Sequence, residues 1–223
     1  MLQTIAIIDY GSGNLRSAAK SFERVIADEG IKARVVVTDK AEDVAKADRI
    51  VLPGQGAFAD CMQGLKNRAG LIAAMEEEVL KKGKPFFGIC VGMQLMASRG
   101  LEHGEHQGLG WIEGDVAKMT PFDKSLKIPH MGWNEVRVTN AGRNHFVLQS
   151  IIDSPGESRT HFYFVHSYMF KCKDAAHDLA DTDYGGRVTA IVGRDNMIGA
   201  QFHPEKSQQA GLALIRDFLR WTP

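Results

Sequence analysis

Residues 85–94 read Pro-Phe-Phe-Gly-Ile-Cys-Val-Gly-Met-Gln, and they carry the most structural information in the chain. The apolar run before the cysteine predicts a strand that is covered on both faces, and residues 91–97 are predicted to form a helix directly after it. Cys90 stands at the junction, with Gly88 and Gly92 two residues to either side. This is the Gly-x-nucleophile-x-Gly spacing of a nucleophile elbow, with cysteine in place of serine. The start of a helix also favours a thiolate, so Cys90 is the candidate nucleophile.

The same alternation of strand and helix extends through the first hundred residues. Strands are expected at residues 5–9, 35–37, 50–52 and 86–89, and helices at residues 15–26, 41–47, 71–80 and 91–97. After Gly100 strands dominate, and they are expected at residues 111–119, 134–138, 161–165, 188–192 and 197–202, before a closing helix at 212–219. The pattern predicts an α/β fold with a mostly parallel central sheet flanked by helices and antiparallel strands added in the second half. We expect one domain over residues 1–223.

Composition narrows the class of protein. The chain has 223 residues with 27 Lys+Arg and 27 Asp+Glu, so it lacks the basic excess expected of a nucleic-acid-binding protein. No apolar run approaches 18 residues and no signal peptide is expected, so we predict no membrane association. The three cysteines form no Cys-x-x-Cys pair, which favours a reduced, cytoplasmic protein.

A thiol nucleophile needs a base, and the base needs a group that orients it. His203 and Glu205 lie two residues apart in a stretch expected to be extended, so their side chains should project to the same side. The carboxylate would then hold one imidazole nitrogen while the other faces Cys90. The Gly-rich turn at residues 53–58 follows a parallel strand, and its backbone N–H groups, together with that of Val91, are candidates for an oxyanion hole.

Other motifs are weaker. Gly11 and Gly13 open a helix after a strand, but the third glycine of a dinucleotide-binding motif is replaced by Arg16. His103 and His106 lie in a Gly-rich loop without further metal ligands, so no metal is expected. The remaining histidines have no carboxylate at the His-x-Glu spacing, and most of them are interpreted as surface or interface residues: His130, His145, His161, His166 and His177.

Several segments together resemble a known family. Pro-Gly-Gln-Gly at residues 53–56, Gly-Ile-Cys-Val-Gly-Met-Gln at 88–94 and His-Pro-Glu at 203–205 resemble the class I (triad) glutamine amidotransferases. Within that class, three further segments are similar to the glutaminase subunits of imidazole glycerol phosphate synthases. They are Asp-Tyr-Gly-Ser-Gly-Asn-Leu at residues 9–15, Pro-His-Met-Gly-Trp-Asn at 129–134 and Tyr-Phe-Val-His-Ser-Tyr at 163–168.

The resemblance implies a glutaminase that passes ammonia to a (β/α)₈-barrel cyclase subunit in histidine biosynthesis, with no cofactor. It makes Cys90 the nucleophile, His203 the base and Glu205 its orienter. The oxyanion strand corresponds to Gly54 and Gln55, and the residues that match the glutamine-binding positions are Gln94, Glu102, Ser167 and Tyr168. The residues that match the face meeting the barrel are Asn14, Pro129, His130, Met131, Trp133, Asn134, Tyr163 and Lys206.

Gln55 departs from the family, which usually has valine at this position of the loop. The oxyanion donor would be the backbone N–H, so the chemistry should survive, while the side chain could change how easily the loop turns. Two alternatives stay open: a glutaminase for another acceptor, such as that of vitamin B6 synthesis, and a catalytically silent binding module.

Overall fold

The computed structural model describes residues 2–152 and 160–223. Its largest sheet has eight strands in the order β2-β1-β3-β4-β14-β13-β12-β9. The first five are parallel to one another: β2 (Ala33–Thr38), β1 (Gln3–Ile8), β3 (Arg49–Gly54), β4 (Phe86–Cys90) and β14 (Met197–Ala200). The last three pair antiparallel: β13 (Arg187–Arg194), β12 (Asp178–Asp183) and β9 (Arg137–Val138). The predicted mixed α/β fold, parallel first and antiparallel later, is confirmed.

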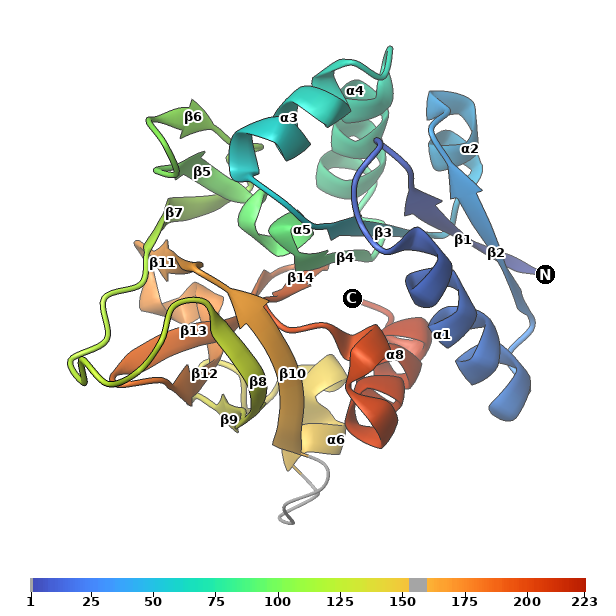
Figure 1. Cartoon of the computed structure of the whole chain (residues 1–223). Coiled ribbons are helices and arrows are strands. Elements are labelled where there is room, and N and C mark those ends of the chain that lie inside the picture. The colour runs from blue at the N-terminus through green and yellow to red at the C-terminus, as the bar shows by residue number, and fades with distance from the viewer. Residues whose placement is uncertain (1, 153–159) are drawn as a thin grey trace.

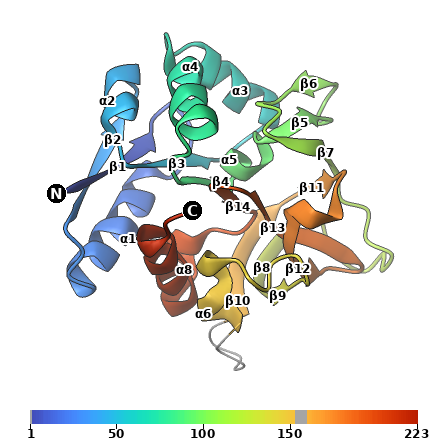
Figure 2. The same ribbon diagram turned by 180° about the vertical axis from the view of Figure 1, so that it is seen from behind.

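Helices cover both faces of the parallel strands. Figures 1 and 2 show α1 (Leu15–Asp28) and α8 (Gln208–Arg220) on one face, and α2 (Ala41–Lys46), α3 (Phe58–Lys66) and α4 (Leu71–Met75) on the other. Burial from both sides explains why the central strands are continuous apolar runs rather than alternating ones. Helix α1 presents Ala18, Phe22 and Val25 to the core at helical spacing, and Phe22 meets Phe218 of α8 edge to face, with ring centroids 6.2 Å apart.

Two smaller sheets complete the second half. One has the order β11-β7-β5-β6 and contains β11 (Tyr168–Cys172), β7 (Ile112–Lys118), β5 (Ala97–Gly100) and β6 (His106–Gln107). The other pairs β8 (His130–Glu135) with β10 (His161–His166). The remaining short helices are η1 (Glu76–Lys81), α5 (Val91–Gln94), η2 (Phe146–Leu148), α6 (Gln149–Ile152), η3 (Ala175–His177) and η4 (Pro204–Lys206). No helix among the residues that the structure describes is long and apolar enough to cross a membrane.

Two expectations about the elements are wrong. The helix predicted over residues 91–97 ends at Gln94, because Ala97 already pairs with Ile112 as the first residue of β5. The strand predicted at residues 134–138 is two strands, β8 and β9, and β8 begins at His130. In addition, β5, β6, β11 and β12 were not predicted, and α3 was missed although its buried residues Phe58, Cys61, Met62 and Leu65 recur at helical spacing.

Candidate active site

Cys90 sits in a sharp turn between β4 and α5. Its backbone has φ 54° and ψ −112°, outside the ordinary regions for a non-glycine residue, and such a conformation costs roughly 1–3 kcal/mol. The flanking glycines allow the turn. A Cβ on Gly88 would lie 2.8 Å from the carbonyl oxygen of Gly92, and a Cβ on Gly92 would overlap the carbonyl oxygen of Leu52. The turn therefore has the close-packed form of a nucleophile elbow.

Helix α5 has only four residues, so the helix dipole contributes less to the polarity of the site than the sequence suggested. Polar side chains next to the sulfur supply it instead. The Nε2 atom of Gln201 lies 3.8 Å from the Cys90 sulfur, and His203 hydrogen-bonds to the same thiol. Both groups come from the chain that follows β14, the parallel neighbour of β4.

His203 and Glu205 make the contact that their spacing predicts, through a different backbone shape. The imidazole Nδ1 and a Glu205 carboxylate oxygen are 2.8 Å apart. The chain is not extended between them, because Pro204 begins the tight turn η4. The backbone N–H of His203 also donates to the carbonyl of Tyr163, which fixes the histidine against β10 at 2.9 Å.

The environment of His203 favours its protonated form. Burial by itself lowers the pKa of the imidazole, but the hydrogen bonds to Cys90 and Glu205 outweigh it and raise the pKa to about 10. Since the Glu205 side chain is only 3% exposed, its charge acts on the histidine with little screening. The three side chains are thus arranged to hold a proton on His203 beside the sulfur.

Gln94 and Gln201 form a buried amide pair. Gln94 was predicted from the sequence and Gln201 was not. The Gln94 Nε2 donates to the Gln201 side-chain oxygen at 2.9 Å and to the Tyr168 carbonyl at 3.2 Å. Both of its amide hydrogens are used inside the protein, so only its oxygen remains to meet a ligand. Gln201 lies two residues before His203, and extending the His-x-Glu spacing by one step backward would have found it.

A hollow of about 410 Å³ opens in front of Cys90. Ten of the residues singled out from the sequence line it: Gln55, Cys90, Val91, Gln94, Glu102, Pro129, Ser167, Tyr168, His203 and Lys206. Gly56, from the Gly-rich turn predicted at residues 53–58, also lines it, as do Val165 and His166, which were not predicted as site residues. Glu205 stands behind His203, and Gly54 pairs with Cys90 in the sheet. The structure therefore brings together residues from β3, β4, α5 and the loops after β5, β10 and β14.

The backbone N–H of Gln55 is already hydrogen-bonded and is therefore not free to donate to an oxyanion. The Ser12 hydroxyl donates to the Gln55 carbonyl at 2.5 Å and accepts from the Gln55 N–H at 3.3 Å. The Cys61 thiol also donates to this carbonyl, at 3.3 Å. Gly13 packs closely on Pro53, so the Gly-x-Gly turn of the first loop lies against the candidate oxyanion loop. Val91 is the first residue of α5, and its N–H has no partner within that helix.

Two other predicted site residues support the local backbone. A Glu102 carboxylate oxygen accepts from the Phe58 N–H at 2.9 Å, so this side chain caps the start of α3 at the edge of the hollow. Asn14 caps α1 by accepting from the Ser17 N–H at 3.3 Å.

Strand β8 has two different faces. Met131 and Trp133 are 61% and 48% exposed, and Trp133 meets Tyr163 of β10 with ring centroids 6.2 Å apart. The Lys206 ammonium lies 5.8 Å from the centre of the Tyr163 ring. The side chain of His130 points the other way and is 2% exposed. The expectation that His130 belongs to an exposed docking face is therefore wrong for its side chain.

His166 is one of the remaining histidines that does not lie at the surface. It is 6% exposed, and its partner across the strands is His130. Burial lowers the pKa of each to about 4, so both rings are neutral at pH 7. Among the described residues, no group of three or more His, Cys, Asp or Glu side chains is placed to hold a metal ion.

Known proteins resemble this chain in sequence and in fold. The family model described as glutamine amidotransferase class-I matches residues 6–221. A protein of Brucella abortus named imidazole glycerol phosphate synthase subunit HisH is 58% identical over 219 residues, covering 98% of this chain and 99% of its own. Proteins of the same name from Rhodospirillum rubrum and Cereibacter sphaeroides are 55% and 53% identical and cover 98% and 97% of this chain and 99% and 98% of their own. A crystal structure of a glutamine amidotransferase, 19% identical, matches the fold with a TM-score of 0.66 over 96% of this chain and 97% of its own.

Proposed function

The chain belongs to the class-I glutamine amidotransferase family, and we propose that it is the glutaminase subunit of an imidazole glycerol phosphate synthase in histidine biosynthesis. The observation that carries the proposal is the cysteine elbow joined to a buried His–Glu pair, in a chain 53–58% identical over nearly its full length to proteins of that name. A cytoplasmic location is part of the proposal and is consistent with three free cysteines.

In the proposed reaction the Cys90 thiolate attacks the side-chain carbonyl carbon of glutamine. The C–N bond breaks, and the proton held on His203 leaves with the departing ammonia. Neutral His203 then takes a proton from water, the hydroxide attacks the thioester carbonyl, and glutamate leaves as the thiolate is restored. Glu205 keeps Nδ1 occupied, so that Nε2 is the nitrogen that exchanges the proton.

The remaining residues of the hollow hold the substrate in this proposal. The free oxygen of Gln94 and the carboxylate of Glu102 suit the α-amino group of glutamine, while Ser167 and Tyr168 also line the hollow, with the Tyr168 carbonyl next to Gln94. Developing negative charge on the carbonyl oxygen would be met by the N–H groups of Val91 and of the Gly54–Gln55 strand.

The Ser12 contact supports low activity in the isolated subunit. As long as the Gln55 N–H binds the Ser12 hydroxyl, it is not available to an oxyanion at Cys90. A subunit that hydrolysed glutamine alone would also lose ammonia to water. We therefore propose that the exposed face of β8 and β10, with Met131, Trp133 and Tyr163, docks a (β/α)₈-barrel cyclase subunit that activates the site.

The test is glutamate release from glutamine by the chain alone and by the chain with a cyclase barrel and its phosphorylated ribulosyl ligand. A rate that rises by orders of magnitude only with the loaded barrel is the expected result. A high rate in the free chain, unchanged by the barrel, would contradict the assigned acceptor and leave the glutaminase chemistry. No glutamate in either case would contradict the enzyme assignment.

A further inference from the structure

His130 and His166 form a direct contact between the two strands of the small sheet. They are paired residues of β8 and β10, and His130 Nδ1 lies 3.0 Å from His166 Nε2. The His130 ring is stacked between Tyr184 and Phe164, with centroids 4.0 and 4.7 Å away. Both rings are thereby held in fixed orientations inside the protein.

The partners of this pair determine which nitrogen of each ring carries the proton. The Asn134 side-chain oxygen accepts from the Glu135 N–H at 2.8 Å, so its amide nitrogen is the atom 3.2 Å from His130 Nε2. An amide nitrogen only donates, so His130 Nε2 accepts and its proton lies on Nδ1. That proton is donated to His166 Nε2.

The hydrogen bond at the other end of this series, between His166 and Tyr168, requires the same assignment. His166 Nδ1 lies 2.9 Å from the carbonyl oxygen of Tyr168, which can only accept, so the proton of His166 lies on Nδ1. Its Nε2 is then free to accept from His130. The two ends independently give one direction of donation: Asn134 to His130, His130 to His166, and His166 to Tyr168.

This chain of donors ends on an atom of the glutamine pocket. The Tyr168 carbonyl also accepts the Gln94 amide at 3.2 Å, and His166 itself lines the hollow beside Ser167. Its beginning lies on β8, whose opposite face exposes Met131 and Trp133. A shift of β8 on docking would therefore move the donor that holds the carbonyl of Tyr168.

We propose that the His130–His166 pair is a positioning element, which ties the exposed docking strand β8 to the Tyr168 carbonyl and so aligns residues 167–168 and Gln94 for glutamine. The inference rests on the proposed function. A neutral relay suits this place, because it joins the two strands without adding a positive charge beside His203.

The first arm of the test reads the protons directly. In ¹⁵N NMR spectra of the full chain at pH 7, both rings are expected to be neutral, with Nδ1 protonated and Nε2 unprotonated. A ring that is charged, or protonated at Nε2, would overturn the relay without any reference to glutamine.

The second arm measures glutamine binding by calorimetry in a Cys90→Ser background, which prevents turnover. His130→Phe keeps an aromatic ring between Phe164 and Tyr184 but removes the donor, and we expect the Kd for glutamine to rise about tenfold, the effect of one lost hydrogen bond. His130→Asn places an amide nitrogen near the Nδ1 position and should restore most of the affinity. His145→Phe removes another neutral histidine away from the hollow, and should leave the Kd unchanged.

The outcomes separate the two proposals. No glutamine binding in the Cys90→Ser parent would contradict the proposed function, while equal Kd values in the parent, His130→Phe and His130→Asn would overturn the positioning role alone. With the cyclase barrel added, glutamine should bind more tightly to the parent and to His130→Asn, and this gain should be lost in His130→Phe. An equal gain in all three, or none in the parent, would overturn the link from β8.

Discussion

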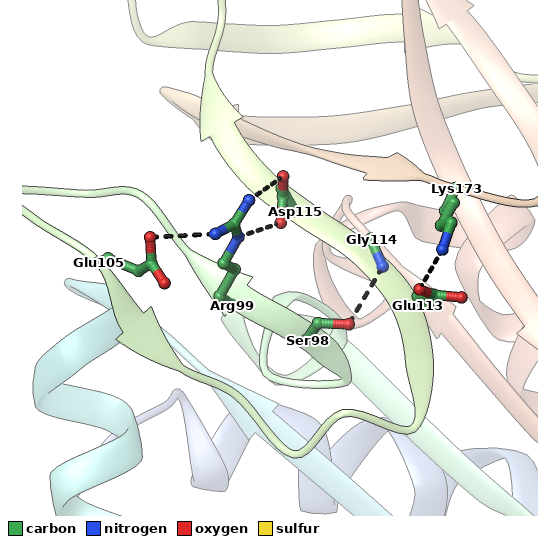
Figure 3. Close-up of polar contacts among 7 residues, drawn as sticks. All are labelled: Ser98, Arg99, Glu105, Glu113, Gly114, Asp115 and Lys173. Carbon is green, nitrogen blue, oxygen red and sulfur yellow. Dashed lines mark hydrogen bonds and ion pairs between the residues drawn. The ribbon is translucent and has the colours of Figure 1, made fainter.

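Two hollows of nearly equal volume lie on this molecule, about 410 Å³ in front of Cys90 and about 400 Å³ on the β5–β7 side of the four-stranded sheet. Four of the charged side chains that line the second, those of Arg99, Glu113, Asp115 and Lys173, are paired with opposite charges, as Figure 3 shows. Arg99 forms two hydrogen bonds with Asp115, at 2.7 and 3.2 Å, and one with Glu105, at 3.0 Å. Lys173 contacts Glu113 at 2.6 Å.

The two hollows differ in whether their polar groups are still free to bind a ligand. In the second, the paired groups are partly or largely exposed, so water screens their attraction and each pair adds little to stability. In front of Cys90 the side chains of Gln94 and His203 are buried, His203 is held protonated, and the Gln94 oxygen remains free for a ligand. Volume alone does not identify a site, and the state of its polar groups does.

The largest expected effect is at the nucleophile. Cys90→Ser should lower glutamine-dependent glutamate release by about 10⁴-fold or more, because removing one member of a catalytic triad removes most of its rate enhancement. The measurement is glutamate release in the presence of the cyclase barrel.

Cys61→Ser is the control for this change. It replaces another buried thiol, which contacts the Gln55 carbonyl, and it should leave most of the activity in place. Comparable losses in both variants would show that Cys90 has no special role.

Gly92→Ala should have the next largest effect. Its Cβ would overlap the Leu52 carbonyl oxygen, so the elbow must move, and we expect about 1–3 kcal/mol of lost stability together with a large loss of activity. Urea unfolding and glutamate release measure the two effects. Gly83→Ala is the control, since no atom lies within 4 Å of its added Cβ and only its left-handed backbone opposes the change. Full activity in Gly92→Ala would contradict the close packing of the elbow.

The next largest effect is expected on the stability of the protein in acid, which should depend on the His130–His166 pair and not on the charged pairs of the second hollow. Burial lowers the pKa of His130 and His166 to about 4, against 6.5 for an exposed histidine. The unfolded chain therefore binds more protons between pH 6.5 and 4, so this stability is present above pH 6.5 and is lost as the pH falls toward 4. At pH 5 the loss is about 2 kcal/mol for each such histidine.

The measurement is the free energy of unfolding at pH 7 and pH 5 in the parent and in His130→Phe, which should lose less between the two. The Asp115 carboxyl, whose pKa is held down by its hydrogen bond to Arg99, stays charged over this range. Arg99→Ala should therefore show the same pH dependence as the parent. An unchanged slope in His130→Phe would contradict the neutral buried pair.

The smallest effect is expected from the second hollow itself. Arg99→Ala should change the free energy of unfolding only slightly and leave glutamate release unchanged, because Arg99 and its partners are partly exposed. Lys173→Ala is the parallel variant, with one exposed carboxylate partner. A marked loss of activity in either would mean that this hollow takes part in the reaction.

The parallel half of the fold could be predicted because its strands and helices are marked by apolar patterns within short stretches of sequence. Apolar runs such as 50–52 and 86–89 are strands buried on both faces, and the stripe Ala18, Phe22 and Val25 marks α1. The two glycines around Cys90 indicate the elbow from the sequence alone, since only a sharp turn requires them at that spacing. The antiparallel half was less readable, because the ends of β8 and β5 depend on pairing with strands far away in the chain.

The site was predictable where a short spacing brings groups together, and not where the sheet does. His203 and Glu205 are two residues apart, whereas His130 and His166 meet through a strand pairing across 36 positions. Neither has a carboxylate nearby in sequence, so nothing local shows that they are buried and bonded to each other. Gln201 was missed for another reason: it lies at the same two-residue spacing before His203, but its amide group carries no charge and was not considered.

The pairing of β3 with β4 places Gly54 directly beside Cys90. The distance between the oxyanion strand and the nucleophile is therefore set by the register of the two strands, and residues 55–85, which connect them, do not set it. Insertions and deletions should be tolerated between residues 66 and 71, in the connection between α3 and α4. A single-residue insertion within β3 or β4 would instead turn the following side chains to the opposite face and uncouple the two halves of the site.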